Sequence, residues 1–303
     1  MAAERTGAPA QIRLRELSIF ITPPKGFLMA AIRGWLDDSR REAIWSVGGY
    51  IGGDFQWEYF EEHWPKALEA VGVSHFHMKE TAKPTGIYSK WHPPQEHKEE
   101  WAAFYASLVS VISDSHIFGI LSVVRGGDLD RFNQERKLAL ELYPLAAYGC
   151  MLLSVRQNIP GLPIQLIFDR VEKVQAKLAT AQSYAESDKH WCPGECDFVT
   201  VSGLGKGVPL QQLPAMQAAD FVAWEFRKHQ ERINEWHELG EVPSDADEAW
   251  SQLEQWIFEK YGSHENAARK SAAALIEPQR FANLVWDYRT LNEVHDLRGG
   301  LWT

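Results

Sequence analysis

The sequence feature that most restricts the fold is an apolar run that ends in two adjacent aspartates. Residues 31–36 read Ala-Ile-Arg-Gly-Trp-Leu, a pattern typical of a central strand, and Asp37 and Asp38 follow directly. Two neighbouring carboxylates at the end of a buried strand cost free energy unless a positive charge lies beside them. A divalent metal ion is the simplest partner of that kind.

Two further acids occur in similar apolar surroundings. Asp169 follows the apolar run 164–168, and Asp220 lies inside the apolar helical run 216–224. An aspartate with apolar neighbours on most sides needs a partner, which favours a shared acidic cluster drawn from distant parts of the chain. The alternatives are a turn that Asp37 caps and an ion pair of Asp169 with Arg170 or Arg125.

Strand and helix patterns alternate along most of the chain and predict one mixed α/β domain. Residues 28–37 and 43–51 fit a hairpin that turns at the charged segment 38–41, and later strands alternate with helices. We expect a five-stranded mixed sheet with helices on both faces and sites at the carboxyl ends of the strands. The expected strands are 28–37, 43–51, 118–124, 163–169 and 198–203, and the expected helices are 55–71, 96–114, 128–158, 171–187 and 213–233.

The ends of the chain are expected to lie outside this domain. The sequence predicts an N-terminal arm at residues 1–26, the α/β domain at residues 27–240 and a C-terminal helical extension at residues 241–303. Two appended helices are expected in the extension, at 248–261 and 278–291. Pro144 is expected to kink the long helix at 128–158.

Composition restricts the class of protein. The chain has 303 residues, of which 45% are hydrophobic, so it can bury a full core. No apolar run approaches the roughly 20 residues that cross a bilayer, and the sequence begins without a signal-peptide pattern, so we expect a cytoplasmic protein without membrane contact. The net charge of −10 argues against a surface broadly coated with nucleic acid, but it allows a local basic groove. Candidates for such a groove are Arg40-Arg41, Lys79 with Lys83 and Lys90, and Arg227-Lys228, and ordinary solvated surface is the alternative.

Cysteine and tryptophan add two weaker expectations. Cys192 and Cys196 are spaced for zinc, but a structural site needs four ligands and no second pair is evident. Five of the 13 tryptophans fall on predicted apolar helical faces, where core packing is expected: Trp57, Trp64, Trp101, Trp224 and Trp256. Trp91 and Trp191 lie in predicted loops and are the better candidates for stacking on a base.

The segment after the first predicted helix carries several polar candidates. His75 and His77 would face the same way in a strand, and with Glu80 they could bind a metal ion, or His77 could act as a general base. The alternative is a loop histidine packed against a tryptophan. Lys79 is a candidate phosphate contact, and solvated surface is its alternative. Gln217, one turn before Asp220, could contact a substrate.

Several of these motifs together resemble a known family. The sequences Asp37-Asp38-Ser39, 47–51, 76–80, Phe168-Asp169-Arg170 and 214–220 resemble the family named domain of unknown function 3800. The resemblance covers roughly residues 28–232. The first motif of the family reads Asp-Glu-Ser-Gly, whereas Asp38 and Arg40 stand here at the Glu and Gly positions. The resemblance implies a ribonuclease H-like fold and a related nuclease site.

These observations lead to one functional expectation and one rival. We expect a metal-dependent nuclease or phosphodiester hydrolase in which carboxylates from different elements hold magnesium or manganese. Asp37, Asp169, Asp220 and Glu80 would be metal ligands, and His77 would join them in catalysis. In the rival interpretation the acids form a structural network in a nucleic-acid or protein interaction module. Increased thermal stability in millimolar magnesium or manganese would favour the enzyme.

Overall fold

A computed structural model describes most of the central part of the chain. The described residues are 32–41, 43–82, 85–92, 94–157, 162–169, 173–187, 199–204, 212–238 and 281–297. The predicted arm at 1–26, the helix predicted at 248–261, and the residues Lys83, Cys192, Cys196 and Trp191 lie outside this set.

A six-stranded mixed sheet forms the centre of the molecule. Its strand order is β5-β4-β1-β2-β3-β6, and among these described strands only β2 runs antiparallel to its neighbours. The strands are β1 (Ile32–Arg41), β2 (Ile44–Gly52), β3 (Phe118–Arg125), β4 (Ile164–Phe168), β5 (Val199–Gly203) and β6 (Phe281–Trp286). The α/β class and the mixed sheet are therefore confirmed, with six strands in place of the predicted five.

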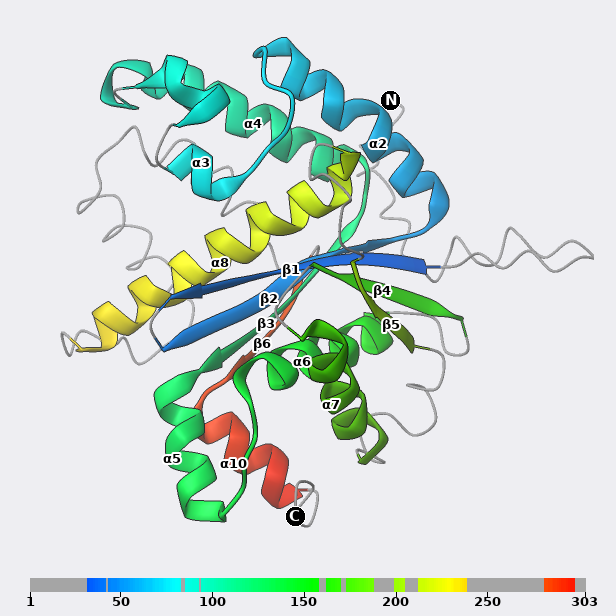
Figure 1. Cartoon of the computed structure of the whole chain (residues 1–303), viewed down its shortest axis with the longest axis vertical. Coiled ribbons are helices and arrows are strands. Elements are labelled where there is room, and N and C mark those ends of the chain that lie inside the picture. The colour runs from blue at the N-terminus through cyan, green and yellow to red at the C-terminus, as the bar shows by residue number, and fades with distance from the viewer. Residues whose placement is uncertain are drawn as a thin grey trace, which may run out of the picture.

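Helices cover both faces of this sheet (Figure 1). On one face lie α2 (Asp54–Ala70), α3 (Met78–Ala82), α4 (Lys98–Asp114) and α8 (Pro214–Glu238), with 3₁₀ turns at Gly86–Trp91 and Pro94–His97. The other face carries α5 (Gly126–Arg136), α6 (Leu142–Gln157), α7 (Val174–Ser187) and α10 (Tyr288–Leu297). None of the described helices is long and apolar enough to cross a membrane.

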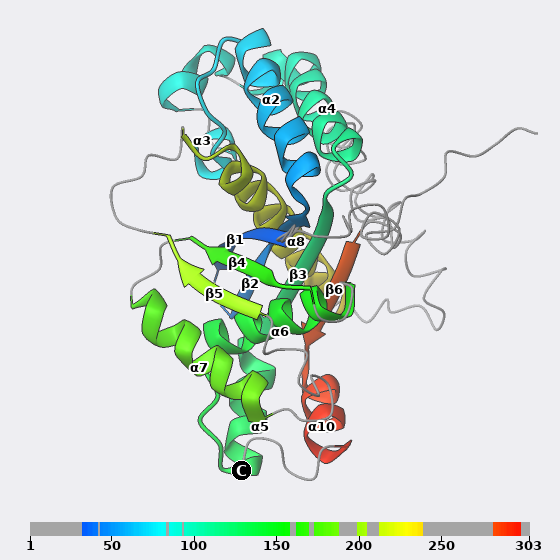
Figure 2. The same ribbon diagram turned by 90° about the vertical axis from the view of Figure 1, so that its right-hand side faces the viewer.

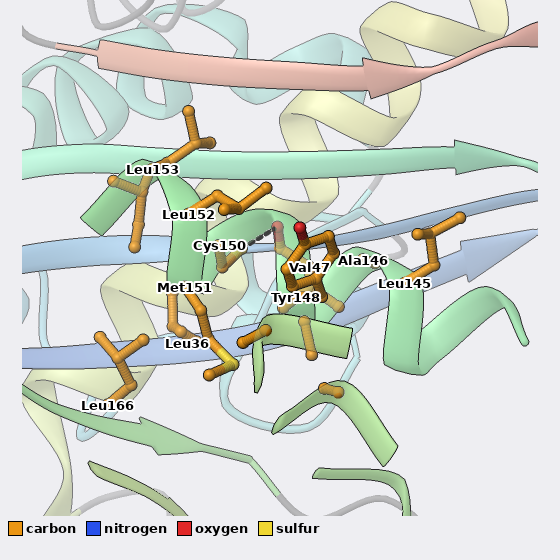
Figure 3. Close-up of a cluster of buried hydrophobic side chains, with 14 of the residues drawn as sticks. Leu36, Val47, Leu145, Ala146, Tyr148, Cys150, Met151, Leu152, Leu153 and Leu166 are labelled. Carbon is orange, nitrogen blue, oxygen red and sulfur yellow. Dashed lines mark hydrogen bonds between the residues drawn. The ribbon is translucent and has the colours of Figure 1, made fainter. Parts of the chain in front are cut away.

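Each face has its own hydrophobic core. On the α6 face, Leu36, Val47 and Leu166 from three strands pack against α6, which is buried along nearly its whole length (Figure 3). The Cys150 thiol there donates a hydrogen bond to the carbonyl oxygen of Val47, 3.2 Å away (Figure 3). A buried helix of this kind is hydrophobic all round, as its sequence is.

Helix α8 lies directly on the sheet and separates it from the α2–α4 pair (Figure 2). A glycine permits this close approach, because a Cβ at Gly49 would lie 3.1 Å from the Cβ of Ala219 and 1.8 Å from the carbonyl oxygen of Trp35. The hydroxyl of Ser46 also donates to the carbonyl oxygen of Ala223, 2.9 Å away. Both contacts fix α8 over β1 and β2, and they thereby fix the position of Asp220.

Several sequence predictions need correction at the ends of elements. Strand β1 continues to Arg41, so Asp37 lies inside the strand and the segment 38–41 is not the hairpin turn. The side chain of Ser39 is buried and contacts α8, which explains why the strand continues past the acids. Two helices, α5 and α6, replace the single long helix that was predicted at 128–158.

The C-terminal extension is also corrected. The predicted helix at 278–291 is replaced by β6 and α10, and β6 pairs with β3 as a sixth strand. The indole of Trp286 is buried and donates a hydrogen bond to the hydroxyl of Ser122, 3.0 Å away. Residues 281–297 therefore belong to the α/β domain and are not an appendage.

Candidate acidic site

The register of two parallel strands brings Asp37 and Asp169 together. Leu36 on β1 pairs with Phe168 on β4, and the amide of Asp169 donates to the carbonyl oxygen of Leu36 at 2.8 Å. The next residue of each strand is the aspartate, so the two side chains are neighbours across the sheet. The sequence could predict this arrangement because both acids follow apolar runs of parallel strands.

The side chains of the two adjacent acids of β1 point to opposite faces of the sheet, because successive side chains alternate along a strand. The carboxylate of Asp38 accepts a hydrogen bond from the indole Nε1 of Trp45, 3.1 Å away, on the face that α6 and α7 cover. Asp37 lies with Trp35 on the face that α8 covers. Its Oδ1 accepts a hydrogen bond from the amide of Asp38 at 2.7 Å.

Asp220 reaches the same region from above the sheet. Its side chain is only 8% exposed, and its Oδ2 accepts a hydrogen bond from the amide of Met78, 2.8 Å away. This bond ties α8 to the first residue of α3, and so to the segment that carries His77 and Glu80. Asp220 therefore links the acids of the sheet to the histidine segment.

The electrostatics of the carboxylates show that the four acids act on one another. Burial, and then the charges of Asp220, Asp169 and Asp38, raise the pKa of Asp37 well above its usual value. Burial and the charge of Asp169 raise the pKa of Asp38 to about 6, although the Trp45 hydrogen bond and the charges of Arg40 and Lys177 oppose this. The chain thus brings together like charges that it compensates only in part.

The pKa of Asp220 follows the same pattern. Burial raises it to about 6, while the hydrogen bond from Met78 and the charge of His77 lower it. The charges of Asp169 and Asp38 add to the increase. The influence of His77 on Asp220 places the histidine segment beside the acids.

Glu80 lies between two histidines. The Nδ1 of His77 lies 3.3 Å from Oε1 of Glu80, and the Nε2 of His75 lies 3.9 Å from Oε2. An ionised carboxylate only accepts hydrogen bonds, so in the contact at 3.3 Å the Nδ1 of His77 is the donor to Glu80. The hydroxyl of Tyr88 donates a hydrogen bond to the carbonyl oxygen of His75 and so connects the 3₁₀ turn Gly86–Trp91 to the histidine segment.

The donor set suits a hard divalent cation, because carboxylate oxygens are the ligands that magnesium and manganese prefer. Within the part of the chain that the structure describes, however, no three His, Cys, Asp or Glu side chains are already placed to ligate one ion. The neighbouring charges raise the pKa values of Asp37, Asp38 and Asp220, but the side chains do not form a finished ligand shell. Rotation of the aspartate side chains would have to complete it.

The two residues predicted to contact substrate have different outcomes. Lys79 is exposed on α3, next to the histidine segment. Gln217 is only 1% exposed, and its Oε1 accepts hydrogen bonds from the indole of Trp64 at 2.9 Å and the amide of Phe76 at 2.8 Å. The structure therefore gives Gln217 a structural role between α2, α8 and the histidine segment, in place of the predicted substrate contact.

Trp91, predicted as a candidate for stacking, is buried. Its ring lies 4.7 Å from that of Trp101 and packs on Tyr88 and Phe104. A base could not reach its face. The loop position in the sequence was misleading because a 3₁₀ turn folds the indole into the core between α2 and α4.

Sequence reasoning named Arg40 as a candidate for a local basic groove but missed the other residues around Asp38. Trp45 and Arg40 are directly paired across the β1–β2 hairpin. The sequence could have predicted this pair if the turn of the hairpin had been placed after Arg41. Lys177 on α7 and Tyr143 on α6 complete the surroundings of this tryptophan. Neither helix position carries a sequence signal that would connect it with the acids.

Comparisons with known proteins add no family assignment. No protein-family model matches the chain, and no curated protein matches its sequence. The geometry of the acidic site therefore carries the functional argument.

Proposed function

We propose that the chain is a magnesium- or manganese-dependent nuclease or related phosphodiester hydrolase with a ribonuclease H-like fold, related to the domain of unknown function 3800 family and acting in the cytoplasm. The observation that carries the proposal is geometric: Asp37 and Asp169 follow the paired residues Leu36 and Phe168 of two neighbouring strands, and Asp220 is buried on the helix that covers them. A chain that holds partly uncompensated carboxylates together in this way is suited to a divalent cation.

The fold supports the same proposal through its connectivity. The acids come from β1, from the end of β4 and from α8, three elements far apart in the chain. Packing and backbone hydrogen bonds hold each element in place, so the carboxylates meet on a rigid frame. Sites of this kind are more precisely positioned than sites built on loops.

We assign Asp37, Asp169 and Asp220 as the residues that would hold the metal, with Glu80 as a further ligand. Bound magnesium or manganese would supply neutralisation of phosphate charge and activation of a water molecule. His77 would hold a proton at Nδ1, oriented by Glu80, and present its Nε2 as a proton acceptor. The Met78 amide orients Asp220 toward this group.

The rival function is a nucleic-acid or protein interaction module in which the acids are a structural network. The absence of a finished ligand shell among the described residues favours it. The two functions differ in their response to metal, because only a metal site stabilises the folded chain by mass action.

The test combines thermal unfolding with an activity assay. We expect millimolar manganese or magnesium to raise the unfolding temperature, and manganese to support cleavage of single- or double-stranded DNA or RNA that stops when a chelator is added. Potassium chloride at matched ionic strength is the control for screening of the acids. If manganese gives no more stabilisation than potassium, and no nucleic acid is cleaved, the enzyme proposal fails.

A further inference from the structure

Two cationic side chains lie over the indole ring of Trp45, on the face of the sheet that α6 and α7 cover. The guanidinium of Arg40 lies 5.1 Å from the centre of the indole ring, and the ammonium of Lys177 lies 5.4 Å from it. The same ammonium lies 5.3 Å from the ring centre of Tyr143, which contacts Trp45 edge-on. We call Arg40, Trp45 and Lys177 the cationic platform.

Three different elements build this platform, so it is not an accident of one helix surface. Arg40 on β1 is the direct cross-strand partner of Trp45 on β2, and Lys177 reaches them from α7. The indole Nε1 donates to Asp38, which fixes the ring plane next to the acids. Cations over an indole face are attracted by its electron density, and this contact holds both side chains in place.

The charges of the two cations lower the pKa of Asp38, but neither cation is held in a close salt bridge among the described residues. Within the part of the chain that the structure describes, neither Arg40 nor Lys177 is engaged in a salt bridge with a carboxylate closer than 4.0 Å. Other surface cations contrast with them, since Lys66 pairs with Glu62 and Arg289 with Glu293, each at 2.7 Å. Arg40 is exposed and Lys177 is half-buried, so both can meet a ligand from solvent.

We propose that the cationic platform binds the phosphate backbone of a nucleic acid beside Asp38, and that the bound strand crosses the carboxyl end of β4 to reach Asp37 and Asp220 on the other face of the sheet. This inference rests on the proposed nuclease function and names a binding surface for its substrate. A chain with a net charge of −10 repels nucleic acid at a distance, so local cations next to the acids must hold the backbone. A guanidinium and an ammonium are the groups that proteins use for phosphate oxygens.

The test variant is Arg40→Gln with Lys177→Gln, compared with a matched control, Lys66→Gln with Arg289→Gln. Both double variants lower the net charge by two, but the control changes only distant cations on α2 and α10. With manganese and labelled oligonucleotides, we expect the platform variant to raise KM about tenfold with kcat within about twofold. Its log–log salt slope should fall by about 1.8 on duplex DNA or about 1.4 on single strands, as for two lost phosphate contacts.

A second variant guards against a folding defect. Lys177→Arg keeps the cation over the indole and should retain the KM of the wild type, and thermal unfolding should show that each variant folds. A platform variant with the KM of the control would overturn the inference while leaving the nuclease function intact. A fall in kcat at constant KM would also overturn it, because the cations would then act through Asp38.

Failure of the proposed function gives a different result. Wild-type chain that neither cleaves the oligonucleotides nor binds them in fluorescence anisotropy with calcium would overturn both proposals. Wild-type chain that binds but does not cleave would remove the nuclease alone, and the platform variant would still have to weaken that binding about tenfold for the inference to stand.

Discussion

Single side chains explain why the acidic site is costly for the metal-free chain. The pKa of Asp37 rises because burial and three neighbouring carboxylates oppose its ionisation. Gln217 is a different case, because its one buried oxygen satisfies two donors from separate elements. Ionised Asp37 thus destabilises the folded chain, whereas Gln217 holds the surrounding segments in place.

The charge of Asp37 predicts a dependence of stability on pH. Folding raises the pKa of this carboxyl, so the folded chain holds the proton more tightly than the unfolded chain does. The stabilising effect is full below the ordinary carboxyl pKa of about 4 and is lost as the pH rises through the raised pKa. The metal-free chain should therefore lose stability from this group as the pH rises above about 4.

Replacing the charge should remove this loss. Asp37→Asn keeps an oxygen for the amide of Asp38, so we expect a gain of about 1 kcal/mol in unfolding free energy over the wild type at pH 8, and a smaller gain at pH 4.5. Urea unfolding in chelator at both pH values measures it. Asp130→Asn, an exposed position on α5, is the control, and an equal gain in the two variants would contradict the prediction.

The role of Gln217 predicts a large loss of stability on its replacement. Gln217→Leu leaves the indole of Trp64 and the amide of Phe76 without this acceptor in the core, which should cost about 2–4 kcal/mol of unfolding free energy. Gln134→Leu on the exposed face of α5 should change it by less than about 0.5 kcal/mol. If the two variants change the unfolding free energy equally in urea, the hydrogen bonds of Gln217 add no stability.

The helices and strands show what the sequence can and cannot predict. Apolar runs located β1 to β5 and the main helices to within a few residues, because burial on a sheet or helix face imposes a period on the sequence. The end of β1 was wrong because Ser39 and Arg40 look like turn residues, and only the packing of α8 keeps that stretch extended. Periodicity could not show β6 either, since its pairing with β3 depends on residues more than 150 positions apart.

Strand β6 should be essential to the fold, not an optional extension. Trp286→Ala removes a fully buried indole that donates to Ser122 and stacks on Tyr148, so we expect a loss of about 3–5 kcal/mol in unfolding free energy. Val285→Ala, at the neighbouring half-buried position, should cost about 1 kcal/mol. If Trp286→Ala unfolds with the wild-type midpoint, residues 281–297 do not support the domain.

In the whole molecule, the site depends on three elements that only the complete fold brings together. The sequence predicted the neighbours Asp37 and Asp169, because parallel strand ends share one edge of a sheet. It could place Asp220 on an apolar helix, but the rotation that turns this residue toward the acids comes from Gly49 and Ser46 beneath α8. The metal assignment therefore needs a test on the complete chain.

Asp169→Asn in the full-length chain provides that test. The amide keeps the size of the side chain but removes the charge that a divalent cation requires, so the fold should survive while metal binding weakens. We expect the manganese-induced rise in unfolding temperature to shrink and the cleavage rate to fall about 100-fold or more, which corresponds to roughly 3 kcal/mol. Asp130→Asn should keep both the rate and the thermal response of the wild type. If instead the wild type cleaves nothing and Asp169→Asn is more stable with and without manganese, the carboxylates only repel one another, and the interaction-module function takes precedence.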